Sequence, residues 1–241
     1  MSSQMTLYDI PSQQGTAWSM APWKVRMILN YKDIEYKTVW LEYPDLAPTL
    51  KSFGLPPNDK TAPGYTTDYS SPAVKYDDGS YGMDSWLIAH ELEKRYPTPS
   101  LHLDDPIVIQ IRDHVSKLID PLVPHFIPKI PSLLCEPSAE YFHRARKEVF
   151  GAPLQELERL GANEKCWENA MMPAKEAGDL LRKNGGPFFL GETVLYPDLI
   201  LVAMLHFMNR INKVLFERYL ALDPAFPKVY EASRKWLQRD S

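Results

Sequence analysis

The chain has 241 residues, of which 44% are hydrophobic and 12% aromatic, and it carries 22 prolines against 11 glycines. Such a composition is typical of a folded globular protein with one or two domains and excludes an intrinsically disordered chain. The 27 basic and 31 acidic residues give a formal charge of −4. This balance excludes a strongly basic surface, so we expect no nucleic-acid partner.

No apolar run approaches the ~20 residues that span a bilayer, and the N-terminus lacks the basic-then-apolar pattern of a secretory signal. We therefore expect a cytoplasmic protein with no membrane partner. The cysteines, Cys135 and Cys166, lie far apart, and the six histidines show no metal-ligand spacing, so we expect neither a disulfide nor a metal site. The short motifs of nucleotide-binding loops, zinc proteases and serine hydrolases are absent from the sequence.

The N-terminal part of the chain combines strand and helix patterns. Residues 5–10 alternate in polarity and are β-prone, which predicts a strand. Residues 22–31 carry apolar side chains at i, i+3 and i+4 after an initial proline, which predicts a helix. Residues 36–41 are rich in β-branched and aromatic types and predict a second strand. This order and spacing favour a right-handed βαβ unit with parallel strands.

A stretch punctuated by proline follows, and residues 54–71 are predicted to form a loop. Residues 72–76 and 80–83, joined by an Asp-Asp-Gly turn, predict a short hairpin, because Asp-Gly between short strands is a strong turn signal. Residues 84–96 predict a helix that ends at a proline-containing linker. The predicted order is therefore β-α-β, loop, β-β-α.

The remainder of the chain shows helical periodicity interrupted by proline. The predicted helical segments are roughly 106–127, 138–182, 196–210, 213–220 and 224–238. Residues 196–208 are the most apolar stretch in the chain and predict a helix that is buried on nearly all sides. The second part is therefore predicted to be all-α.

Several motifs in this order resemble those of the glutathione transferase superfamily. They are Leu-Tyr-Asp-Ile at 7–10, Ser19-x-x-x-Trp23-Lys24-x-Arg26, Pro72-Ala-x-x-x-Asp-Asp-Gly79, Asp84-Ser85-Trp86, and Phe188-Phe-Leu-Gly-Glu192 followed by Asp198. They are most similar to the fungal FuA-type transferases, which are related to bacterial β-etherases that cleave lignin ethers. The resemblance implies an α/β thioredoxin-like N-terminal domain at 1–97, a linker at 98–105, and an all-α C-terminal helical domain at 106–241 that forms the electrophile pocket.

The resemblance also implies where glutathione binds. Pro72 matches the cis-proline of the thioredoxin fold, and a cis bond turns the backbone N–H and C=O of Ser71 outward, where an extended ligand can pair with them. Asp84 and Ser85 begin a helix, where capping is the ordinary role of such residues. The resemblance adds that Ser85 and the helix N-terminus hold the γ-glutamyl carboxylate, while Asp84 faces the α-amino group.

Ser19 precedes the first helix and matches the family's catalytic serine, whose hydroxyl stabilises the glutathione thiolate. The sequence departs from the family pattern because Met20 stands where proline is usual, and the proline is displaced to Pro22. Tyr8 is an alternative, because some transferases use a first-strand tyrosine, but its position inside the strand favours a packing role. Trp18 is expected to line the electrophile pocket.

Two further points follow from the comparison with the family. The loop at 54–70 could lie over the glutathione site, form a dimer contact or take no fixed position. The sequence also leaves open whether Lys51 or Lys60 reaches a glutathione carboxylate. Leu195 stands where the family usually has Ser or Thr, three residues before Asp198. We therefore expect the buried helix to lack a capping box.

The function implied is a homodimeric glutathione transferase that conjugates the glutathione thiolate to small hydrophobic or aromatic electrophiles. Glutathione peroxidase or aryl-ether-cleaving activity would use the same thiolate. The alternative is a non-catalytic, ligandin-type carrier of phenolic, wood-derived compounds. A regulatory protein that has lost the chemistry fits less well, because Ser19, Pro72, Asp84 and Ser85 are all present.

Overall fold

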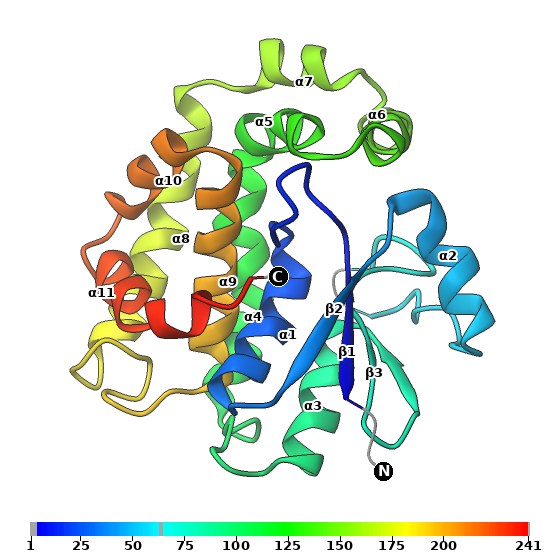
Figure 1. Ribbon diagram of the computed structural model, residues 1–241. Helices are drawn as coiled ribbons and strands as arrows, with labels where there is room; N and C mark the ends of the chain where they lie inside the picture. The colour runs from blue at the N-terminus through cyan, green and yellow to red at the C-terminus, as the bar shows by residue number, and fades with distance from the viewer. Residues whose placement is uncertain (1–3, 63–64, 241) are drawn as a thin grey trace.

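A mixed four-stranded sheet forms the centre of the N-terminal domain in the computed structural model, which describes residues 4–62 and 65–240 (Figure 1). Its strands are β1 (Met5–Asp9), β2 (Tyr36–Trp40), β3 (Ala73–Lys75) and β4 (Tyr81–Met83), in the order β2-β1-β3-β4. β1 and β2 are parallel, whereas β3 is antiparallel to both β1 and β4. The predicted parallel pair and the predicted hairpin are both confirmed.

Helices cover both faces of this sheet. α1 (Met20–Tyr31) and α3 (Ser85–Arg95) lie on one side, and α2 (Tyr43–Ser52) lies on the other (Figure 1). The apolar stripe of α1 joins the large core that the sheet shares with the C-terminal helices. A smaller cluster lies on the α2 side and consists of Tyr8, Leu50, Ala73 and Met83.

The sequence does not predict α2, because Pro44 and Pro48 interrupt its pattern. Pro44 stands in the first turn, where the helix needs no N–H donor from it. Pro48 removes one bond from the helix interior. Leu46 and Leu50, which are four residues apart, are buried on the same face, and their burial offsets that loss.

The second half of the described chain is helical. Its elements are α4 (Pro106–Ile119), η1 (Asp120–Leu122), α5 (Val123–Phe126), η2 (Ile127–Leu133), α6 (Glu136–Phe150), α7 (Leu154–Gly161), α8 (Glu164–Arg182), α9 (Tyr196–Ile211), α10 (Lys213–Leu220), α11 (Ala225–Ala232) and η3 (Arg234–Leu237). The all-α prediction is confirmed, but the predicted segments 106–127 and 138–182 are wrong in extent. Closely spaced prolines turn the first into short 3-10 and α pieces, and Gly151, with φ of 71°, ends α6 in the left-handed conformation.

α9 lies at the centre of the helical domain, and all its residues from 196 to 208 are buried, as predicted. The prediction that its capping box is absent is confirmed for Leu195, which makes no side-chain cap bond, but not for Asp198, which supplies the other half of the box. The Asp198 carboxylate accepts the N–H of Leu195 at 2.8 Å, and the Asp198 N–H donates to the Leu195 carbonyl at 3.1 Å. The second bond is a backbone turn, so the half of the box that a serine side chain would supply is missing. No helix among residues 4–62 and 65–240 is both long and apolar enough to cross a bilayer.

A buried lysine at the end of α1 holds the end of α3 and the start of the predicted linker. The Lys32 ammonium donates to Oε2 of Glu93 and to the carbonyls of Tyr96 and Pro99, each at 2.6 Å, and its side chain is fully buried. Burial raises the pKa of Glu93, but hydrogen bonds from Lys32 and its neighbours outweigh that effect and lower the pKa. The linker bounds 98–105 stay a prediction.

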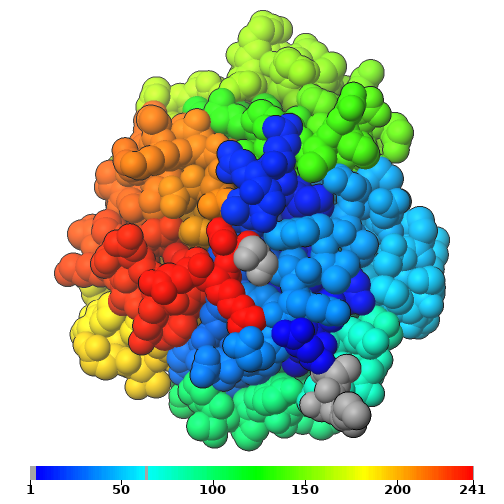
Figure 2. All heavy atoms as spheres, in the orientation of Figure 1, coloured from blue at the N-terminus to red at the C-terminus, as the bar shows by residue number. Residues whose placement is uncertain are grey.

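The C-terminal residues return to the N-terminal domain. Asn30 of α1 donates to the Trp236 carbonyl at 2.7 Å, and the rings of Tyr31 and Trp236 meet edge to face at 5.2 Å. In Figure 2 this C-terminal segment, coloured red, lies directly against the blue N-terminal residues. The first helix is therefore covered by the last part of the chain.

Candidate functional site

The sheet register brings three predicted site segments to one end of the sheet. Tyr8, near the end of β1, pairs with Ala73 at the start of β3, and Ala73 pairs with Met83 at the end of β4. The residue before β3 and the residues after β4 therefore lie at the same end as the residues after β1. Because α1 returns antiparallel to β1, its N-terminus lies at this end as well.

The Ser71–Pro72 peptide bond is cis, as the sequence predicts. Pro72 is buried, whereas Ser71 is partly exposed and lies just beyond the last residue pair of β1 and β3. The Ser71 hydroxyl donates to the carbonyl of Tyr8 at 3.2 Å. This bond fixes the start of β3 against the end of β1.

Asp84 is the N-cap of α3, and Ser85 is the first residue of that helix. The Asp84 carboxylate accepts the backbone N–H of Trp86 at 2.8 Å and that of Leu87 at 3.1 Å, with a backbone φ of 75°. The predicted capping role is therefore confirmed. The Ser85 carbonyl accepts the phenol O–H of Tyr196 at 3.3 Å, which ties this helix end to the helical domain.

Ser19 is the N-cap of α1, and its carbonyl accepts the N–H of Trp23 at 3.1 Å. Its side chain makes no capping bond. A serine cap ordinarily accepts from the N2 or N3 backbone N–H, but position N3 is Pro22, which has none. The partly exposed hydroxyl of Ser19 is therefore not committed to the helix, and the first turn of α1 contains no acidic residue.

Lys24 is a charged residue of the site that the sequence reasoning missed, although it lies within the quoted motif. Its side chain is only partly exposed, and burial lowers the pKa of its ammonium group. The nearby carboxylate of Asp84 acts in the opposite direction and favours the charged form. Its position after a tryptophan on the first helix was the available signal, but nothing in a single sequence shows that the charge of Asp84 acts on it.

Tyr8, the alternative to Ser19, packs in the α2-side cluster. It is 8% exposed, and its ring lies 5.1 Å from that of Phe53 and 6.5 Å from that of Tyr81. Burial raises the pKa of its phenol, and Tyr81 adds to the effect. The predicted packing role is confirmed.

Trp18 is 2% exposed, and its ring packs 6.4 Å from that of Phe207 on α9. Its place in an electrophile pocket stays a prediction. Lys51 lies over the ring of Tyr69 at 5.2 Å, and Lys60 lies 4.0 Å from Asp68. Both lysines therefore have partners in or beside the loop that precedes Ser71.

A buried ion pair supports this end of the sheet. Arg26 of α1 donates to Asp9 at the end of β1 at 3.0 Å, and both side chains are fully buried. Arg26 also donates to Thr38 of β2 at 3.1 Å. Burial raises the pKa of the Asp9 carboxyl, and the Arg26 charge offsets part of that rise. The pair links β1, α1 and β2 beneath the predicted site.

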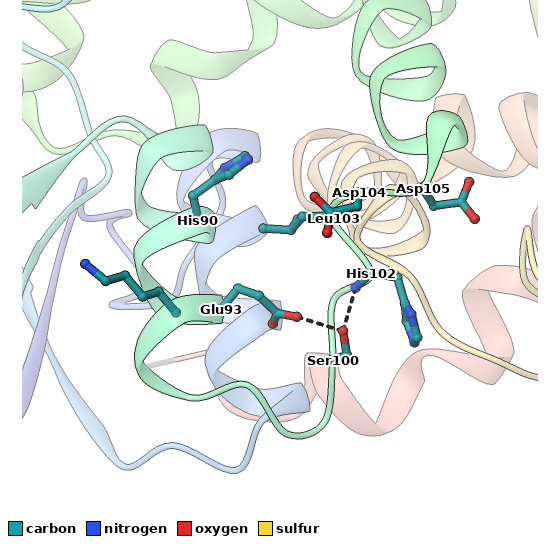
Figure 3. A pocket seen from close by; sticks show the side chains of 8 residues that line it. His90, Glu93, Ser100, His102, Leu103, Asp104 and Asp105 are labelled. Atoms are coloured by element: carbon teal, nitrogen blue, oxygen red, sulfur yellow. Dashed lines mark hydrogen bonds between the residues drawn. The ribbon is translucent and has the colours of Figure 1, made fainter.

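A cavity of about 610 Å³ lies elsewhere, between α3 and the segment that leads to α4 (Figure 3). It is lined by His90, Glu93, Lys94, Ser100, His102, Leu103, Asp104 and Asp105. Figure 3 shows Glu93 and Ser100 hydrogen-bonded to each other at its wall. None of the predicted site residues lines this cavity, which belongs to the joint between the domains.

Cys135 and Cys166 are free thiols. Burial raises the pKa of Cys135, and the carboxylate of Glu42 raises it further, so this thiol is kept protonated. Across residues 4–62 and 65–240, His, Cys, Asp and Glu side chains form no group of three or more that could hold a metal ion.

Comparison with known proteins agrees with this arrangement. Residues 18–95 match the family described as "Glutathione S-transferase, N-terminal domain", and residues 111–215 match "Glutathione S-transferase, C-terminal domain". A glutathione S-transferase-like protein of Aspergillus flavus, ustS, is 32% identical, and the alignment covers 98% of this chain and 92% of that protein.

Solved fungal structures share the fold. GSTFuA3 of Phanerochaete chrysosporium has a TM-score of 0.89 at 24% identity and covers 100% of both chains. CsGST63524 of Ceriporiopsis subvermispora, a glutathione S-transferase solved in complex with glutathione, has a TM-score of 0.84 at 27% identity, with 97% of this chain and 98% of that chain covered. The matches to both domains and the relative aligned along almost the whole chain show that this protein belongs to the glutathione S-transferase family.

Proposed function

We propose that the protein binds glutathione and attacks small hydrophobic or aromatic electrophiles with its thiolate, which Ser19 stabilises. The observation that carries this proposal is the meeting of Ser19, Ser71, Asp84 and Ser85 at one end of the sheet, with the Ser19 side chain free of a capping bond. The glutathione-bound fungal relative supports glutathione as the co-substrate.

The energy required of the site is modest. A thiol with a pKa near 8.5 is mostly protonated at pH 7, and a shift of about two units, or about 2.7 kcal/mol, makes the thiolate dominant. A hydrogen bond to a charged group contributes about 1.5–3 kcal/mol, and a helix N-terminus up to about 2 kcal/mol. Ser19 and the N-terminus of α1 together suffice, since no acidic residue in the first turn opposes them. No general base is needed.

The remaining residues orient the co-substrate. In this proposal the backbone of Ser71 pairs with the cysteinyl unit, and Ser85 with the N-terminus of α3 holds the γ-glutamyl carboxylate. Asp84 faces the α-amino group. Fixing the thiolate beside a bound electrophile then converts a bimolecular attack into a reaction within one complex.

The electrophile site, the assembly and the location complete the proposal. The electrophile binds in an apolar pocket between the domains, with Trp18 as part of its wall. Peroxides and aryl ethers are further substrates that the same thiolate would attack. The protein acts as a cytoplasmic homodimer.

The test is the ultraviolet absorbance of the glutathione thiolate bound to the wild type and to the Ser19→Ala variant, titrated from acid to neutral pH. We expect a lowered thiol pKa in the wild type and a rise of about one unit or more in the variant, which is about 1.4 kcal/mol. Tyr8→Phe tests the alternative donor. Ser116→Ala, at an exposed serine of α4, is the matched control, and neither variant is expected to move the pKa.

The outcomes separate the candidate roles. If the bound glutathione thiol has a lowered pKa that Ser19→Ala leaves unchanged, the transferase proposal stands. The helix N-terminus, and not Ser19, would then stabilise the thiolate. Bound glutathione with an ordinary thiol pKa, together with tight binding of phenolic ligands, would favour the ligandin-type carrier. Absence of glutathione binding would refute the proposal.

A further inference from the structure

The loop between β1 and α1, residues 10–19, carries Ser19 at its end and is folded around one serine. The Ser12 hydroxyl donates to the Thr16 carbonyl at 2.8 Å and accepts the Thr16 N–H at 3.1 Å. The N–H of Gly15 donates to the Ser12 carbonyl at 2.9 Å. These bonds shape the loop but do not fix it relative to the rest of the molecule.

The helical domain fixes the first half of this loop. The Gln13 N–H donates to the Leu133 carbonyl at 2.8 Å, and its side-chain amide donates to the Leu134 carbonyl at 2.7 Å. Leu133 ends η2, and Leu134 is fully buried. Both contacts precede Ser19 by several residues, so they leave its immediate neighbours to other partners.

Arg210, in the last turn of α9, holds the second half of the loop. One of its guanidinium nitrogens donates to the hydroxyl of Thr16, and another lies 3.8 Å from the carboxylate of Asp240. The Asp240 carbonyl in turn accepts the N–H of Ala17 at 2.9 Å. Arg210 therefore contacts the loop directly at Thr16. It also contacts Asp240, which binds the next loop residue, Ala17.

The segment that contains Asp240 has anchors of its own. Arg239 donates to the Tyr36 carbonyl at 2.5 Å and forms two bonds with the Glu35 carboxylate at 3.1 and 3.2 Å. With the bond from Asn30 to the Trp236 carbonyl, this segment is fastened to both α1 and β2. Asp240 thus reaches Ala17 from a fixed support.

We propose that Arg210 is a positioning residue for Ser19: together with Asp240 it fixes Thr16 and Ala17, and so sets where the Ser19 hydroxyl lies. This inference rests on the proposed function of Ser19. Between the fixed residues and Ser19 stands Trp18, whose ring is buried against α9. The three residues before Ser19 are therefore all held by the helical domain or by the C-terminal segment.

The proposal has a physical basis in the short reach of a hydrogen bond. Ser19 must direct its hydroxyl at the thiolate, and its side chain has no bond of its own to the helix that would orient it. Its placement therefore depends on the backbone that leads to it. A displacement of about 1 Å by a change away from the chemistry can cost about a hundredfold in rate.

The experiment compares Arg210→Ala, Arg210→Lys and Thr16→Val with the wild type. Thr16→Val keeps the shape of the side chain and removes the acceptor for Arg210. Arg234→Ala is the matched control, because Arg234 is an exposed arginine whose ion pair with Glu231 lies within its own turn. The readouts are the pKa of the bound glutathione thiol, and kcat and KM with an aromatic electrophile over a range of pH.

We expect Arg210→Ala to raise the thiol pKa by about one unit, which is about tenfold less thiolate at neutral pH. The limb of the pH–rate profile that reports this thiol should move by the same amount. KM for glutathione should change less than about threefold, because the groups proposed to bind glutathione are not touched. Arg210→Lys should recover part of the shift, and Thr16→Val should reproduce most of it.

A purely structural role for Arg210 gives a different result. The variants would then lower the melting temperature while the thiol pKa and the pH profile stay at the wild-type values, and this outcome overturns the proposal. If Arg210→Ala does not fold, Thr16→Val decides the question alone. Failure of the proposed function is recognised separately, because the wild type would then show no lowered thiol pKa and Ser19→Ala would have no effect.

Discussion

At the scale of single residues, His206 shows how burial sets a protonation state. Its ring lies edge-on to Trp23 at 4.4 Å, and its Nδ1 is 2.8 Å from the phenol oxygen of Tyr230. Burial lowers the pKa of His206 to about 3, and the nearby Arg210 charge acts in the same direction. The imidazole is therefore neutral in the folded protein at every pH where the protein is expected to work.

This histidine predicts a loss of stability in mild acid. An unfolded histidine takes up a proton near pH 6.5, whereas folded His206 does not until about pH 3. The contribution of His206 to the free energy of unfolding should therefore fall by about 1.4 kcal/mol per pH unit as the pH drops below about 6.5. Asp198 contributes in the opposite direction, because burial raises its pKa to about 7, so the His206 slope is the difference between the wild type and a His206 variant. His206→Asn, which keeps an acceptor near the Nδ1 position, should remove this slope in urea unfolding. His143→Asn, at an exposed site, should leave the slope unchanged.

Arg26 and Asp9 form the second residue-scale case, because neither has access to water. Removing one partner leaves the other charge buried and unpaired, so Arg26→Met should lower the free energy of unfolding by about 3–5 kcal/mol. The double variant Asp9→Leu/Arg26→Met should recover most of the loss, because both charges are gone. Urea unfolding measures both. A cost below about 1 kcal/mol for Arg26→Met would contradict the role of this pair.

At the scale of the element, the start of α3 allows the two roles of Asp84 to be tested separately. Asp84 caps the helix, and it is also the proposed partner of the glutathione amino group. Asn is as good a cap as Asp and tolerates positive φ, so Asp84→Asn should leave stability within about 0.5 kcal/mol. It should still weaken glutathione binding, because the charge is lost. Asp84→Ala should lower stability by about 1 kcal/mol and should also weaken glutathione binding. Urea unfolding measures the first effect, and calorimetric titration with glutathione measures the second.

The sequence predicts the elements whose pattern is local. The strand pairing of β1 with β2, the hairpin around Gly79 and the buried course of α9 all follow from periodicity and turn residues. α2 does not, because its two prolines mask a helix whose stability comes from leucines buried against the sheet. Residues 120–133 divide into short turns because prolines stand too close together for one helix.

For the candidate site, too, local features could be predicted and contacts between distant elements could not. Resemblance in sequence is enough to predict the cis bond before Pro72 and the helix starts after Ser19 and Asp84, since each depends on a local motif. The proximity of Lys24 to Asp84 and the contacts of Arg210 could not be predicted. Their partners come from elements distant in the chain, and no local pattern fixes how two such elements meet.

At the scale of the whole molecule, Lys32 fixes the point at which the chain leaves the N-terminal domain. Its buried ammonium group donates hydrogen bonds to one carboxylate and two backbone carbonyls. Lys32→Met would remove the shared donor of these partly buried acceptors and should lower the free energy of unfolding by about 2 kcal/mol. Lys37→Met, at an exposed position of β2, should change it by less than about 0.5 kcal/mol. Urea unfolding measures both variants, and equal unfolding midpoints would contradict this role of Lys32.

The contacts of the β1–α1 loop also determine the order in which the sheet and the candidate site form during synthesis of the chain. The partner of Thr16 is 194 residues further along the chain, and the partner of Gln13 is 121 residues further. The β1–β2 pairing needs only residues up to Trp40, so the sheet can begin to assemble on a nascent chain long before this loop has its partners. On a ribosome-bound chain of increasing length, strand formation should therefore come early. Lowering of the glutathione thiol pKa should come only when almost the entire polypeptide has emerged.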